Sequence, residues 1–216
     1  MPIDATDMLV VHRVFRREFN DLPALIATVP EGDCVRAKQI ADHVRFIVTA
    51  LHHHHTAEDD HAWPKLRARA PHRAIEIARM ADEHAEIAYA VETVESLVAK
   101  WTKSVEPALT DQLAMAASEL SVLVGRHLDD EERDAVPLIE QYLTQDEWSA
   151  ATKQAASFIT VRNFRLGIVL GGLVLEGASD GERRMILSGA PLPQRVVVQL
   201  FGARAAALYR RRLHGD

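Results

Sequence analysis

The stretch LHHHHTAEDDHAWP, residues 51–64, combines histidine imidazoles with carboxylates at close spacing. Neutral imidazole and ionised carboxylate are ligands for iron, manganese and zinc in proteins. A purification tag also contains consecutive histidines, but tags lie at chain ends, whereas this run lies a quarter of the way into the chain. If its histidines point into a core rather than into solvent, the stretch predicts a metal site.

The apolar spacing before the run indicates which histidines are buried. Apolar residues recur at helical spacing from Val44 to Leu51, and the same spacing continues to His54 and Glu58. Residues four apart share one face of a helix, so these two side chains should prolong the buried stripe. His55 falls at the edge of the stripe, and the first two histidines of the run turn towards solvent.

Three other predicted helices also carry a histidine in their apolar stripe. His12 lies in a helix over about residues 6–28, His84 in one that begins after Pro71, and His127 in one that begins near Thr110. Glu131 follows His127 by four residues, as Glu58 follows His54. A buried carboxylate without a compensating charge costs several kcal/mol, and a bound metal ion would compensate it.

The sequence also contains an internal repeat. His12 and His84 are 72 residues apart, and the pattern H-x3-E-x5-P occurs at His54 and again 73 residues later, ending at Pro64 and Pro137. One helical hairpin used twice predicts an all-α, up-down-up-down four-helix bundle with additional C-terminal helices. At about 1.5 Å per residue, all four histidines should lie at one level and form a symmetric dinuclear site.

These motifs resemble those of the hemerythrin-like, or HHE cation-binding, family of non-haem di-iron four-helix bundles, over roughly residues 8–142. The resemblance leaves two alternatives open, namely His55 in place of His54 and Glu132 in place of Glu131. In the oxygen-carrying branch of the family the third helix has a second histidine one turn further on, and here that position is Ala88. The ligands that the resemblance implies, with both glutamates bridging the two irons, are His12, His54, Glu58, His84, His127 and Glu131.

The ligand types and the resemblance together suggest a function. Imidazole and carboxylate without thiolate favour two iron ions, joined by an oxo or hydroxo bridge, over manganese or zinc, with an open position on each ion for H2O2, O2 or NO. Because Ala88 disfavours oxygen carriage, the first hypothesis is decomposition of hydrogen peroxide, of catalase or peroxidase type. The alternative is binding or sensing of O2, NO or iron without turnover. Side chains that could orient ligands or shuttle protons are His55, His61, Tyr89 and Asp130.

The C-terminal third carries no further ligand set. We expect residues 1–143 to form the bundle and residues 144–216 a helical extension that packs on the bundle or forms a homodimer interface. Capping boxes at Thr144 and Ser179 predict helices near 145–164 and 180–188. The apolar stretch 166–175 is too short to span a bilayer, and its Gly167-x-x-x-Gly171 spacing suits close helix packing.

Composition excludes several classes of protein. The single cysteine, Cys34, excludes an internal disulfide framework. A net charge of −6 argues against a nucleic-acid partner. The N-terminal residues lack the basic region and apolar run of a signal peptide, so we expect a cytoplasmic protein without a membrane partner.

Overall fold

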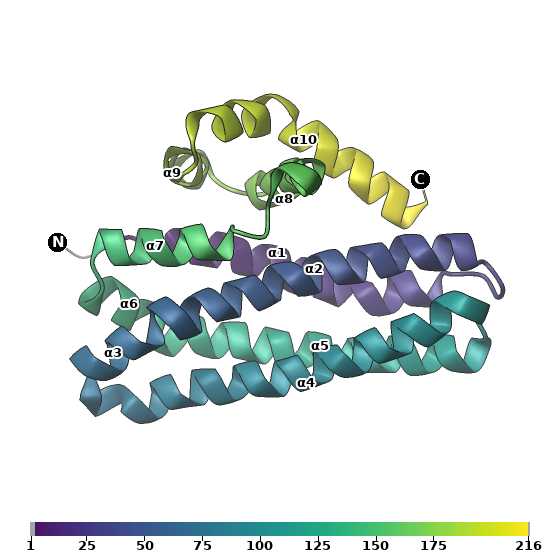
Figure 1. The fold of residues 1–216 in the computed structure, drawn as a ribbon, viewed down its shortest axis with the longest axis horizontal. Coiled ribbons are helices and arrows are strands. Elements are labelled where there is room, and N and C mark those ends of the chain that lie inside the picture. Colours follow the sequence, from purple (N-terminus) through teal and green to yellow (C-terminus); the bar gives the residue numbers. More distant parts are fainter. Residues whose placement is uncertain (1–2, 216) are drawn as a thin grey trace.

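Four long antiparallel helices form the body of the molecule in the computed structural model, which describes residues 3–215 (Figure 1). These helices are α1 (Thr6–Ala27), α2 (Cys34–His61), α4 (Ala74–Ser104) and α5 (Pro107–Asp134). Both α1 and α4 pack against α2 and α5, so the chain runs up, down, up and down around one core. The expected fold class, an all-α bundle with additional C-terminal helices, is confirmed.

Local sequence explains where the long helices begin. Gly32 has a φ of 76°, in the left-handed region that glycine adopts readily, and it lets the chain reverse before α2. The Asp33 side chain then accepts a hydrogen bond from the backbone N–H of Arg36, which caps the helix. Pro107 opens α5, where a helix needs no N–H from its first residue.

A proline breaks each half of the repeat at the same place. Helix α2 ends at His61 and is followed by α3 (Trp63–Arg69), and α5 ends at Asp134 and is followed by α6 (Val136–Tyr142). Pro64 and Pro137 occupy the first turn of these short helices, because proline has no N–H with which to continue the preceding hydrogen-bond ladder. Helices α3 and α6 pack against each other and close one end of the bundle, and the short turn η1 (Pro71–Arg73) leads into α4.

The interior contains two apolar clusters with polar residues between them. The larger cluster, nearer the α1–α2 connection, includes Leu51 and Ile87, and the smaller one, beneath α3 and α6, includes Ala62 and Met80. Along α2, His54, His55 and Glu58 lie between Leu51 and Ala62. Along α4, His84 lies between Met80 and Ile87. The bundle therefore holds its polar side chains in a layer that apolar packing seals on both sides.

The C-terminal helices lie over α1 and α2 (Figure 1). Helix α7 (Gln145–Ala155) packs along α2 and begins with the expected capping box at Thr144. The expectation that this helix continues to about residue 164 is wrong, because α7 ends at Ala155. Beyond it, the side-chain oxygen of Asn163 accepts hydrogen bonds from the backbone N–H and the hydroxyl of Thr160 and starts a new turn, η2 (Val161–Asn163). The chain then forms α8 (Phe164–Leu175), α9 (Asp180–Gly189), which Ser179 caps, and α10 (Leu192–His214).

Helices α8 and α10 pack closely because glycine lies at their contact. A Cβ atom on Gly172 would clash with the backbone oxygen of Gly202, and one on Gly171 would lie 2.8 Å from the Val198 side chain. The apolar stretch that includes these glycines is therefore buried partly by a neighbouring helix of the same chain. Within residues 3–215, no helix is both long and apolar enough to cross a membrane.

A polar cluster joins α10 to the bundle. Glu18 of α1 is buried and accepts hydrogen bonds from Arg17 at 2.9 Å and from Arg210 of α10 at 3.2 Å. His43 of α2 is 1% exposed, and its Nδ1 lies 2.9 Å from the hydroxyl of Tyr209. Removal from water is offset only where such groups find partners, so this cluster fixes the position at which α10 docks.

We expect Gly172→Ala to lower the free energy of unfolding by about 1–3 kcal/mol, because the new methyl group meets backbone that cannot rotate away. Urea titration followed by circular dichroism measures the change. Gly125→Ala in α5 is the matched control, since a Cβ there meets nothing within 4 Å. That change should stabilise the helix by about 0.5–1 kcal/mol. Equal effects in the two variants would contradict the close contact.

Stability should also depend on pH through His43. Burial, together with the nearby charges of His214 and Arg210, lowers the pKa of His43 to about 4. Between pH 6.5 and 4 the unfolded chain binds this proton and the folded chain does not, so stability is lost as the pH falls through this window. Relative to His43→Gln, the wild-type protein should lose about 2 kcal/mol between pH 7 and pH 5 in matched metal-free samples. If the wild-type protein and His43→Gln lose the same free energy of unfolding between pH 7 and pH 5, the prediction is wrong.

Candidate metal centre

Seven buried histidine and glutamate side chains meet in the polar layer of the bundle. Their ligand atoms form two groups, and within each group these atoms lie within 4.8 Å of one another. Each group draws on three of the four long helices. The first group is His12, His54, Glu58 and Glu131, and the second is His55, His84 and His127.

Glu58 lies between the two groups. One carboxylate oxygen, Oε1, is 3.1 Å from Nε2 of His54 in the first group. The other oxygen, Oε2, is 3.6 Å from Nε2 of His84 in the second group. A carboxylate whose two oxygens face different sets of imidazoles has the orientation of a bridging ligand.

Glu131 occupies the related position on α5. Its Oε2 atom is 3.4 Å from Nε2 of His12 and 3.6 Å from Nε2 of His127, so it also contacts both groups. Its side chain has no exposed surface. The alternative that sequence left open, Glu132, lies at the edge of the bundle with 29% of its side chain exposed. Of the two carboxylates, Glu131 is therefore the one placed to hold a metal.

Three of the histidines are oriented by carboxylates outside the centre. In each case Nδ1 contacts a carboxylate oxygen, and when Nδ1–H donates this bond the lone pair of Nε2 is directed to the centre. This is the arrangement that fixes metal-binding histidines in proteins. The pairs are His12 with Glu132 at 2.9 Å, His84 with Asp59 at 3.0 Å, and His127 with Glu83 at 3.0 Å.

Two of these pairs follow the internal repeat. Asp59 of α2 contacts His84 of α4, and 73 residues further on Glu132 of α5 contacts His12 of α1. The orienting carboxylates were not identified from the sequence, yet they immediately follow Glu58 and Glu131. Applying the repeat to the residues after the two glutamates would have identified this pair of contacts.

The centre is not symmetric, contrary to the expectation from the repeat. Both His54 and His55 are buried in it, at 8% and 7% exposure, whereas sequence placed His55 at the edge of the stripe or as a substitute for His54. Successive residues on a helix point about 100° apart, so α2 directs one imidazole to each group. The ring of His55 stacks on that of His84, with centroids 4.0 Å apart. In the second half of the repeat, the position equivalent to His55 is Leu128, so only one group contains a third histidine.

Burial controls the protonation of the centre. It lowers the pKa values of His54 and His55 well below the ordinary value, and the neighbouring imidazoles add to this effect. Burial, reinforced by the charge of Glu131, raises the pKa of Glu58 well above its ordinary value. Partial burial also raises the pKa of Glu132, but hydrogen bonds from His12 and Arg16 outweigh this and hold it at about 2. His54 and His55 are thus favoured in the neutral form that binds metal, and a nearby cation would favour the ionised form of Glu58.

The donor atoms fit a metal site. A buried polar atom without a partner costs about 1–3 kcal/mol, and such atoms are rare in folded proteins. Here a whole set of them faces one centre, and cations bound between the two groups would satisfy them together. The set combines imidazole nitrogen with carboxylate oxygen and no thiolate, which suits iron or manganese. At the centre, the buried atoms without a hydrogen-bond partner are Nε2 of His55, His84 and His127 and both carboxylate oxygens of Glu58 and Glu131.

The remaining residues named from sequence lie away from the centre. Nε2 of His61 contacts Gln154 of α7. Tyr89 is 74% exposed on α4, and Asp130 pairs with Arg79 and Arg133. The carboxylates that contact the histidines directly are Asp59, Glu83 and Glu132.

A four-helix bundle with five histidines and two glutamates enclosed between apolar layers defines a class of helical cation-binding proteins. Residues 5–139 match the family described as the hemerythrin HHE cation binding domain, and the chain belongs to this family. The resemblance inferred from the motifs is thereby confirmed. Searches of curated proteins and of solved structures find no match for the chain.

The centre predicts which histidines of the run bind metal. After loading with ferrous iron, His54→Ala and His55→Ala should each lower the iron content per chain, since each removes a donor from one group. Glu58→Ala should lower it further, since this side chain contacts both groups. Thermal stability should fall together with the iron content, because a ligand that binds only the native state stabilises it. Elemental analysis and thermal unfolding measure the two effects.

His52→Ala is the matched control, because His52 is exposed on the same helix. It should leave both iron content and stability unchanged, as surface substitutions usually shift stability by less than about 0.5 kcal/mol. Equal losses in all four variants would show that the helical phase of the run is wrong.

Proposed function

We propose that the protein holds two non-haem iron ions in this centre and decomposes hydrogen peroxide there. The observation that carries the proposal is the set of buried, unpartnered nitrogen and oxygen atoms directed at one point. Iron bound between them would supply open coordination positions and a redox couple for a small oxidant. The side chains of the protein determine where such an oxidant binds and how protons reach it.

The protein side chains make the two metal positions unequal. The second group offers three imidazoles and the first only two, while both share the glutamates. A position with fewer imidazoles has more room for a small ligand. We therefore place the oxidant beside His12 and His54. Phe15 packs on His54, with ring centroids 5.3 Å apart, and this apolar contact narrows the space beside that histidine.

The polar edge of the same position holds a proton on His12. Nδ1 of His12 contacts Glu132, which also accepts a hydrogen bond from Arg16 at 2.7 Å. Glu132 and Arg16 are both partly exposed, so this chain of contacts runs from the centre towards solvent. Because the pKa of Glu132 is held at about 2, the carboxylate stays ionised and keeps Nδ1 of His12 protonated. His12 thereby keeps its lone pair on Nε2.

A second function is favoured by His55. The sequence disfavours reversible oxygen binding because Ala88 takes the place of a second histidine on α4, which leaves the four expected histidines. His55 of α2, however, supplies a fifth imidazole to the centre. Binding or sensing of O2 or NO without turnover is therefore the alternative to peroxide decomposition, at the same iron centre.

Spectra and oxygen evolution distinguish the two functions. Protein loaded with iron should show near-ultraviolet absorption that the zinc-loaded protein lacks, and it should release O2 when H2O2 is added in an oxygen electrode. His54→Ala and Glu58→Ala should abolish the release, and His52→Ala should retain it. A reversible spectral change with O2 or NO, without turnover of peroxide, would favour the alternative. A fully loaded protein that does neither would refute both functions.

A further inference from the structure

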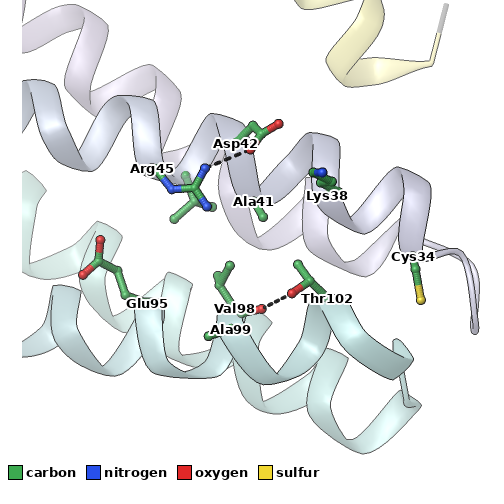
Figure 2. Close-up of a pocket in the computed structure, with 10 residues that line it drawn as sticks. Cys34, Lys38, Ala41, Asp42, Arg45, Glu95, Val98, Ala99 and Thr102 are labelled. Carbon is green, nitrogen blue, oxygen red and sulfur yellow. Dashed lines mark hydrogen bonds and ion pairs between the residues drawn. The ribbon is translucent and has the colours of Figure 1, made fainter.

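Two of the cavities outside the metal centre differ in character. The one between α2 and α4 has a volume of about 480 Å3 and is drawn in Figure 2. Its polar rim consists largely of solvated side chains such as Lys38 and Glu95, with Cys34 at one end. No buried polar side chain among the residues that line it is available to fix a ligand.

The other cavity lies where the C-terminal helices meet α2 and has a volume of about 380 Å3. Sites for small molecules typically have volumes of about 300–1,000 Å3, apolar walls and a few fixed polar groups. The volume of this cavity lies in that range, and the cavity has both apolar walls and fixed polar groups. Its apolar walls are formed by Phe46, Phe158, Leu166 and Leu213.

The aromatic walls are held in place by their neighbours. Phe46 packs edge-on against Tyr209, with ring centroids 6.0 Å apart. Phe158 stacks on His53, with centroids 5.2 Å apart and ring planes 24° apart. Rings fixed on two sides of a cavity suit a flat aromatic molecule, because aromatic pairs add to the burial of apolar area.

One polar group of the cavity is fixed by a buried partner. The hydroxyl of Tyr209 lies 2.9 Å from Nδ1 of His43, which is 1% exposed. Nε2 of His43 faces the carboxylate of Glu18 at 3.7 Å. That neighbour favours the proton on Nε2, so Nδ1 accepts the hydrogen bond of Tyr209. The phenol oxygen then keeps its lone pairs for a donor on a ligand.

The charged rim favours an anion. Of the three charged residues that line the cavity, Asp42 and Arg45 pair with each other at 2.9 Å, a contact also drawn in Figure 2. Arg212 has no carboxylate partner within residues 3–215. The backbone oxygens of Arg212 and Leu213 accept hydrogen bonds from Arg36, which fixes the end of α10. The backbone of Arg212 is thus fixed at the rim, and its exposed guanidinium is available to a carboxylate.

We propose that this cavity is a binding site for a small aromatic carboxylate with a hydroxyl or N–H donor. The carboxylate pairs with Arg212, the ring lies between Phe46 and Phe158, and the donor bonds the oxygen of Tyr209. The site is independent of the metal centre and of the reaction there.

The probes are three fluorescent naphthalenes added to the full-length protein. 6-Hydroxy-2-naphthoate carries the acid and the donor, 2-naphthoate lacks the donor, and 2-naphthylmethylamine replaces the acid with a cation. The first should bind with one site per chain and a Kd no weaker than about 1 mM, as expected for a ligand of this size. 2-Naphthoate should bind several-fold more weakly, and the amine should not bind.

Three variants assign the contacts. Arg212→Gln should weaken binding of both acids by about tenfold, as expected for a lost charge-assisted contact. Its matched control is Arg211→Gln, since Arg211 is a neighbouring exposed arginine that does not line the cavity. Tyr209→Phe should remove the advantage of the hydroxylated probe and leave 2-naphthoate unaffected. Thr49→Phe, on α2, should fill the cavity and block both acids, with unchanged circular dichroism showing that the variant is folded.

The outcomes separate the proposal from nonspecific binding. Equal weakening by Arg211→Gln and Arg212→Gln, or binding of the amine as tight as that of the acids, would reduce the effect to general charge attraction and overturn the proposal. So would the absence of saturable binding, or binding that survives Thr49→Phe in a folded protein. Iron content should be the same with and without the probes.

Discussion

The structure depends on two carboxylates buried at the centre of a helical bundle. Neither Glu58 nor Glu131 has a hydrogen-bond partner for its oxygens, and burial makes an isolated negative charge costly there. Five imidazoles face the same point and are held neutral or oriented as acceptors by their surroundings. The apolar clusters on both sides separate these carboxylates and imidazoles from solvent. Bound cations would satisfy these groups together.

The charges outside the centre support the ones inside it. Asp59, Glu83 and Glu132 contact the outer nitrogens of three histidines, and arginines contact two of these carboxylates in turn. Each layer thus orients the layer within it. The same logic does not apply where α10 docks, because Glu18 there is neutralised by two arginines of the chain itself. Glu18 is thus paired without a metal, and the role of this cluster is to hold α10 in place.

Much of the centre could be predicted because helical spacing is regular. The apolar stripe up to Leu51 correctly placed His54 and Glu58 inside the bundle, and the repeat gave the four-helix fold. The burial of His55 was missed because the apolar stripe of α2 indicates a single buried face, whereas α2 packs against both α1 and α4. The break in the helix at Pro64 follows from the missing N–H of proline. From the sequence alone, however, a break could not be distinguished from a kink in one continuous helix. The orienting carboxylates depend on contacts between helices, which spacing along one helix does not encode.

The division of donors between the two hairpins has an evolutionary consequence. Each group takes residues from both halves of the repeat: His12 and His54 meet Glu131, and His55 meets His84 and His127. A single ancestral hairpin could therefore have assembled such a centre only as a pair of identical copies, with identical halves. Within one chain the two halves can differ, and here His55 has a leucine as its counterpart and Glu83 a valine. A pair of identical hairpins could not form such an unequal pair of metal positions.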